Sequence, residues 1–184
     1  MAGPFATATE ICEFSGMSIP SDLSRLQALA HRASAVIRSY CDNQTLSAVT
    51  GDVITVYPTA SSFLSLPERP VTAVTLVLVN GVATTDYYIV PRGLRSGTVA
   101  SPGSAWTMGA TVTYAHGHAE SSEAFKAIQS VCIEMVKRAY TADEAGQALS
   151  QGGFPVETVG FPTTLFLTQD NKETLRPFRR GPVR

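Results

Sequence analysis

Apolar residues change their spacing twice along the chain. Residues 21–41 repeat them at alternating intervals of three and four, which predicts an amphipathic helix. Residues 53–115 instead carry β-branched and aromatic residues in short runs between glycine, proline and asparagine, a pattern typical of strands and tight turns. Helical spacing returns after residue 122. The sequence therefore predicts an α+β fold with two main amphipathic helices and a strand-rich centre.

Local signals predict where the helices begin and end. Thr7 and Glu10 match a capping box, and Gly16 offers a stop, so a short helix should precede the first main one. The serine pair at 121–122 can cap the second main helix, whose apolar face recurs through residues 125–139. Ser21 and Asp22, which follow Pro20, give the N-terminal signal of the first main helix, so all three expected helices begin beside a hydroxyl side chain.

Turn residues divide the centre into strands. Asn80-Gly81 between apolar flanks is a strong hairpin signal, because both residues tolerate positive φ. The stretch Pro91–Gly103 is rich in glycine, serine and arginine, and we expect a mobile loop there. The expected strands lie near Val53–Tyr57, Ser62–Leu66, Val71–Val79, Tyr87–Val90 and Ala110–Ala115.

Glycine and proline interrupt any regular pattern from Gly146 onward. We expect an irregular linker, at most a short helix near Thr168–Arg176, and a basic tail to Arg184. The predicted division is a core domain of residues 1–145 and an extended C-terminal arm of residues 146–184.

The basic tail has three possible roles. It could contact DNA phosphates, insert between subunits of a partner protein, or solubilise the chain end. Pro177 and Phe178 stand among arginines, and aromatic and arginine side chains are enriched in interface hot spots, which favours a protein partner. The residues expected at that contact are Phe166, Leu167, Leu175, Arg176, Phe178, Arg179, Arg180 and Arg184.

Composition argues against several classes of function. Charged residues make up 16% of the chain, below the roughly 25% of ordinary globular proteins. The formal net charge of -1 supplies no positive field for phosphate backbones, which disfavours a nucleic-acid-binding module. The N-terminus lacks a secretory signal and no apolar run is long enough for a membrane span, so we expect synthesis in a cytoplasm and no membrane partner.

Side chains capable of catalysis are sparse. His116-Gly117-His118, with Glu120 nearby, could hold a metal ion, but the simpler interpretation is a strand end that turns at the glycine. His31 should be solvated, and the three cysteines have no paired spacing and should be buried. We therefore expect no cofactor and no catalytic or metal site, with a small enzyme bearing a His116/His118 metal site as the alternative.

Five short strings follow one another along the chain: Glu10–Gly16, Ile37–Cys41, Leu64–Val71, Asp86–Val90 and Val112–Gly117. In their order and spacing they resemble the adaptor or head-to-tail connector family of long-tailed bacteriophages. The family's usual prolines before the last long helix are replaced here by Ser121-Ser122-Glu123, and the C-terminal stretch is long.

This resemblance implies a structural protein of the virion neck, made in the cytoplasm of a bacterial host. Members of the family form a closed, dodecameric ring beneath the portal protein and above a stopper or tail protein, with genomic DNA passing through the lumen. A heterologous contact repeated by a rotation that closes makes such a ring, so each subunit needs two complementary faces. A stopper or tail-completion protein, which would bind the adaptor, is the alternative within the neck.

Overall fold

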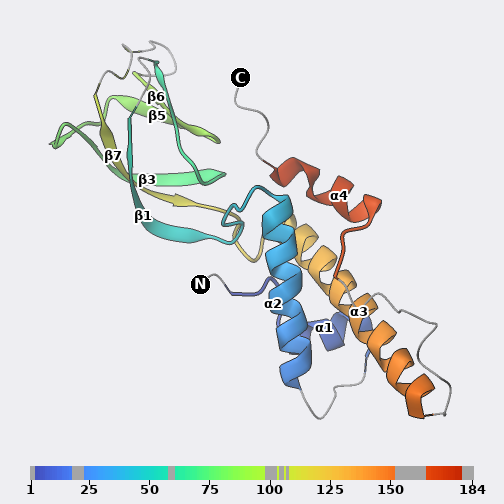
Figure 1. Cartoon of the computed structure of the whole chain (residues 1–184). Coiled ribbons are helices and arrows are strands. Elements are labelled where there is room, and N and C mark those ends of the chain that lie inside the picture. Colours follow the sequence, from blue (N-terminus) through green and yellow to red (C-terminus); the bar gives the residue numbers. More distant parts are fainter. Residues whose placement is uncertain are drawn as a thin grey trace. The chain divides into compact units, whose positions relative to one another are not determined.

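The chain forms two compact units (Figure 1). The helical unit comprises Met1–Asn43 and Glu123–Arg184, and the strand unit comprises Gln44–Ser122. A computed structural model describes residues 3–17, 23–57, 61–97, 103, 106, 108–151 and 165–179, with the backbone alone for 143–151.

Four α-helices and one 3-10 turn make up the described part of the helical unit. None of these helices combines the length and apolarity that crossing a bilayer requires. Their bounds are α1 Ala8–Ser15, α2 Leu23–Tyr40, α3 Glu123–Gln151 and α4 Gln169–Leu175, followed by the 3-10 turn Arg176–Phe178.

The predicted caps of α1 are confirmed. The Thr7 hydroxyl accepts a hydrogen bond from the Glu10 amide at 3.2 Å, and the Glu10 carboxylate accepts one from the Thr7 amide at 2.7 Å. Gly16 ends the helix in the left-handed conformation, at φ 65°. This reciprocal pairing satisfies backbone donors that the first turn cannot bond internally.

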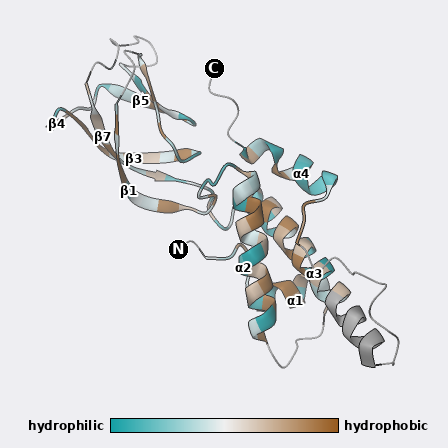
Figure 2. Cartoon of the chain, viewed as in Figure 1, coloured by the Kyte–Doolittle hydropathy of each residue, from teal (hydrophilic) through white to brown (hydrophobic). Residues whose placement is uncertain are grey.

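The apolar faces of α2 and α3 form the core of the helical unit. Figure 2 shows brown, hydrophobic residues interspersed with teal, hydrophilic ones along both helices, and the buried residues of α2 recur at the predicted spacing. Ser34 is buried among them because its hydroxyl donates to the Ala30 carbonyl and accepts from the Phe5 amide. The fully buried positions include Leu26, Ala30, Ala33, Ile37, Ile128, Cys132 and Val136.

Helix α3 is longer than predicted. It continues through Gly146 to Gln151, so the expected irregular linker is wrong for residues 146–151. A glycine inside a helix costs about 1 kcal/mol relative to alanine but does not block the backbone hydrogen bonds. Strong helix formers surround it, since alanine, glutamine and leucine dominate residues 145–149. The predicted division at residues 145/146 stays a prediction.

Two antiparallel sheets make up the strand unit. One has the order β1-β7-β3-β4 and the other β2-β6-β5. Side chains from both sheets join one hydrophobic cluster that includes Leu64, Leu94, Val77, Val112 and Tyr114. The strands are β1 Val49–Val56, β2 Phe63–Ser65, β3 Val71–Val79, β4 Val82–Ala83, β5 Tyr87–Val90, β6 Gly93–Ser96 and β7 Ala110–His116.

The strand predictions are confirmed with one correction. Asn80 and Gly81 form the β3–β4 turn with φ of 50° and 80°, as predicted. The loop expected at Pro91–Gly103 is wrong for residues 93–96, which form β6 between β2 and β5. Leu94 is fully buried there, and a Cβ at Gly93 would collide with the Leu64 carbonyl oxygen. Residues 98–102 of the expected loop lie outside the described part of the chain. The α+β class is confirmed.

Candidate partner-binding surfaces

A cluster of polar side chains around Asn171 holds α4 on α3, and we call it the Asn171 clasp. Asn171 is only 3% exposed, and its side-chain oxygen accepts from the Arg138 guanidinium at 2.9 Å and from the Thr168 amide at 3.2 Å. Its side-chain nitrogen donates to the Glu134 carboxylate at 2.8 Å. One buried amide thus caps its own helix and binds two charged residues of α3, which fixes the position of the C-terminal segment on the helical unit.

The end of the segment is held by the C-terminus of α2. Leu175 is fully buried, and the Tyr40 hydroxyl donates to the Lys172 carbonyl at 3.2 Å. The Arg179 guanidinium lies 5.0 Å from the centre of the Tyr40 ring and 3.9 Å from the Asp42 carboxylate. Residues 168–179 therefore pack on their own chain along most of their length.

The residues predicted to bind a partner fall into three groups. Phe166 is 51% exposed beneath the Arg138 guanidinium, and Arg176 and Arg179 are also exposed. Leu167 and Phe178 are half-buried, whereas Leu175 lies in the core of its own unit. Arg180 and Arg184 lie outside the described residues. Partner contact by the exposed residues stays a prediction.

The His-Gly-His string lies where a strand ends and the chain turns, as the simpler interpretation predicts. His116 ends β7, with Nε2 3.4 Å from the Asp52 carboxylate. Gly117 turns the chain at φ 85°, where a side chain would collide with the Ser47 backbone. Burial lowers the pKa of His118. No cluster of three or more His, Cys, Asp or Glu side chains suited to a metal ion occurs among the described residues.

The remaining histidine and the three cysteines lie where the sequence predicts. His31 is exposed on α2, as expected. Cys12, Cys41 and Cys132 are free and buried, which confirms the prediction for all three. Burial, with the charge of Asp42 as a smaller cause, raises the pKa of Cys41 to about 11. Because the thiolate is the reactive form, this thiol is unsuited to nucleophilic chemistry at neutral pH.

One sheet face of the strand unit is uncharged. Val53, Thr113 and Leu76 stand opposite one another across β1, β7 and β3, and so do Thr55, Thr111 and Leu78. Partners in register share a face, so these two rows form one surface, here called the uncharged sheet face. Val53 is 61% exposed and Leu76 is 41% exposed, which leaves apolar side chains open to contact.

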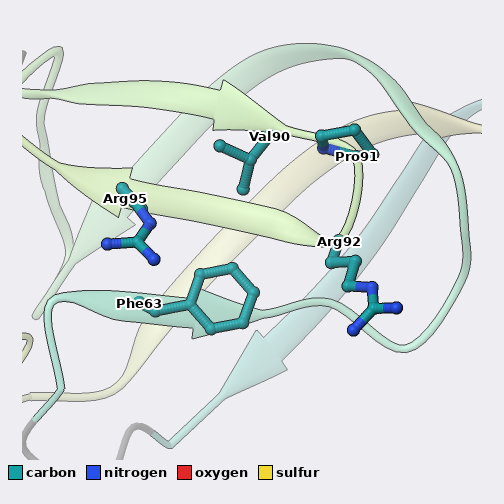
Figure 3. A pocket seen from close by; sticks show the side chains of 5 residues that line it. All are labelled: Phe63, Val90, Pro91, Arg92 and Arg95. Atoms are coloured by element: carbon teal, nitrogen blue, oxygen red, sulfur yellow. The ribbon is translucent and has the colours of Figure 1, made fainter. Parts of the chain in front are cut away.

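The second sheet presents a different surface. Arg95 of β6 stands between Phe63 of β2 and Tyr88 of β5, and its guanidinium lies 5.9 Å from the centre of the Phe63 ring. Phe63, Arg95, Arg92, Val90 and Pro91 line an open pocket of about 400 Å³ (Figure 3). This surface is called the arginine pocket below.

The same fold occurs in solved virion structures. One is a chain of the neck of an empty gene transfer agent particle computed with C6 symmetry, and another is a chain of the virion of a native gene transfer agent particle. Each is 14% identical, with a TM-score of 0.50 over 100% of this chain and 94% of the other. No protein-family model and no curated protein matches the chain. At this identity the likeness establishes a shared fold.

The clasp is the feature that sequence reasoning missed. Thr168 and Asn171 have the three-residue spacing of a capping box, and the structure shows both of its hydrogen bonds. The short helix predicted near Thr168–Arg176 is confirmed as α4, and this local signal marks its start. The partners Arg138 and Glu134 lie 33 and 37 residues away, so no local pattern connects them to Asn171.

Proposed function

We propose that this chain is a structural protein of a virion neck: a head-to-tail connector, or adaptor, that forms a ring between the portal protein and the stopper or tail. The observation that carries the proposal is the fold shared with a neck chain over 100% of this chain and 94% of that one. The order of phage-adaptor-like strings in the sequence supports it independently. The role is mechanical, namely joining two assemblies around the passage for genomic DNA, and it involves no catalysis.

Contact between copies of the chain is supported by the uncharged sheet face. Apolar and threonine side chains can be buried against a neighbour without the cost of removing a charge from water. A ring requires this face to meet a different face of the next copy. We propose twelve copies, and a twelve-fold ring contains the six-fold rotations used for the similar neck particle.

Docking on the portal is assigned to the C-terminal segment. Phe166 and Arg176 are exposed, and the Asn171 clasp holds the segment in place before any partner arrives. A contact surface that is already ordered loses less conformational entropy on binding. Arg179 is less suited to this role, because Tyr40 and Asp42 of the same chain already contact it.

The docking assignment is tested by binding to the purified portal protein. We expect the double variant Phe166→Ala/Arg176→Glu to bind at least about ten-fold more weakly, as would deletion of residues 176–184. Arg32→Glu, at an exposed position of α2, is the matched control and should bind like the wild type. Unchanged portal binding by both altered proteins, with circular dichroism showing that they fold, would contradict the assignment.

A stopper or tail-completion protein is the alternative, because the fold of a neck chain is compatible with either ring. Such a protein contacts an adaptor ring and leaves the portal free. Chemical cross-linking of the purified chain separates the two: cross-links to the portal support the adaptor, and cross-links to a separate adaptor alone support the stopper.

A further inference from the structure

Charge is rare and unevenly placed in the strand unit. Only 7 of the 79 residues in Gln44–Ser122 are charged, four of them acidic and three of them arginine. All three arginines belong to one side of the β2-β6-β5 sheet. Arg92 and Arg95 line the pocket, and Arg69 donates to the hydroxyl of Ser65, which stands opposite Gly93 on the same face. The unit's whole positive charge therefore gathers at one surface.

The arginine pocket combines positive charge with an apolar floor. Figure 3 shows the Phe63 ring between the side chains of Arg92 and Arg95, with Val90 and Pro91 beside it. Phe63 and Val90 are half-buried, so part of each remains open to a ligand. A ligand seated on Phe63 would have a guanidinium on either side.

Carboxylates of the strand unit do not neutralise the two guanidiniums. Among the described residues, no acidic side chain lies within 4.0 Å of Arg92 or Arg95 to form an ion pair. Asp52 contacts His116, and Glu68 accepts from the Thr45 amide at 2.6 Å. Arginine forks match carboxylates in shape as well as charge, so two guanidiniums without an ion pair favour an acidic ligand.

We infer that the arginine pocket binds an acidic segment of a partner protein, in which two carboxylates flank one apolar side chain. The carboxylates bind Arg92 and Arg95, and the apolar side chain covers Phe63, Val90 and Pro91. The inference goes beyond the neck assignment and does not depend on it, because it follows from the chemistry of the pocket alone.

A protein segment fits this surface better than nucleic acid. Three arginines against four carboxylates leave the strand unit with a net charge of -1, so no broad positive field would hold a phosphate backbone. Nucleic-acid binding without base readout relies on many phosphate contacts, and the pocket offers two guanidiniums. An apolar floor between the cations suits a side chain such as leucine.

The test is a titration of the isotope-labelled full chain, followed by amide chemical shifts. The probes are the capped peptide Gly-Asp-Leu-Asp-Gly, its amide counterpart Gly-Asn-Leu-Asn-Gly, and a single-stranded oligothymidylate. We expect the acidic peptide to shift the amides of β5 and β6 at millimolar concentration or below, and the amide peptide to leave them unchanged. The double variant Arg92→Ala/Arg95→Ala should bind the acidic peptide at least about ten-fold more weakly, and the control Arg32→Ala should bind it like the wild type.

Two outcomes would overturn the inference. In the first, the acidic peptide shifts no amide signals of β5 or β6, or it binds the double variant as tightly as the wild type. The second is oligothymidylate binding more tightly than the peptide and losing its affinity in the double variant, which would assign the pocket to nucleic acid. Both arginines are exposed, so the double variant should keep its fold, and the wild-type amide spectrum away from the pocket checks this. The titration needs no portal, so its failure is distinguishable from a failure of the neck assignment.

Discussion

The helical and strand units use polar side chains differently. In the helical unit 22 of 105 residues are charged, and several of them join one part of the unit to another. Arg138 and Glu134 hold Asn171 of α4, and Glu10 of α1 accepts from Gln129 of α3 at 3.1 Å. The strand unit has 7 charged residues in 79 and packs instead through an apolar cluster and backbone ladders. Charged side chains therefore connect helices within the helical unit. The strand unit instead leaves one sheet face uncharged and places its arginines at the arginine pocket.

The largest effect on stability is expected where the C-terminal segment enters the helical core. Leu175→Ala should lower the free energy of unfolding by about 2–5 kcal/mol, because a fully buried leucine leaves a cavity. Urea denaturation measures this, and Phe166→Ala, at a half-exposed position of the same segment, is the control. A loss below about 1 kcal/mol for Leu175→Ala would mean that α4 contributes little to the unit.

A smaller loss should follow removal of the clasp. Asn171→Ala removes the hydrogen bonds to Arg138 and Glu134 together with a helix cap, so we expect a loss of about 1–3 kcal/mol in the free energy of unfolding. Lys172→Ala, at the exposed neighbouring position, should change stability by less than about 0.5 kcal/mol. Equal stability of the two variants in urea would show that polar side chains do not secure α4.

Alkaline pH should weaken the two units through different groups. Burial raises the pKa of Cys41 in the helical unit to about 11, and that of Tyr114 in the strand unit to about 12. In the folded protein the pKa of each group lies above its ordinary value, which is 9.0 for Cys41 and 10.0 for Tyr114. The protonated group therefore contributes its full stability below the ordinary pKa, and this contribution is lost as the pH rises through the folded pKa. As the pH rises through these values, the free energy of unfolding should fall less steeply in Cys41→Ala and in Tyr114→Phe than in the wild type. If the free energy of unfolding falls with pH as steeply in both variants as in the wild type, these two groups do not cause the alkaline loss of stability.

The smallest effect on stability should occur at the uncharged sheet face. Val53→Lys replaces an exposed side chain and should change the free energy of unfolding by less than about 0.5 kcal/mol. The same substitution should prevent assembly, because a lysine cannot be buried between copies without losing its hydration. Val82→Lys is the control, since Val82 pairs with Val79 on the opposite face of that sheet. If mass photometry with the portal shows that Val53→Lys assembles normally, the uncharged sheet face does not form the contact between copies.

Short-range signals predicted the fold well, and long-range pairing could not be predicted from them. Thr7, Glu10 and Gly16 act within ten residues of one another, and Asn80-Gly81 needs only its flanking strands. The sequence predicts the end of α3 too early, because a single glycine lowers helix propensity without ending a helix that strong helix formers surround. The arginine pocket depends on register, since only the pairing of β2, β6 and β5 brings Phe63 beside Arg95.

Electron microscopy of the purified chain with its portal protein tests the central proposal most directly. We expect closed rings of this chain at one end of the portal, with twelve copies around a central opening. A portal that stays bare at every concentration of the chain would contradict it.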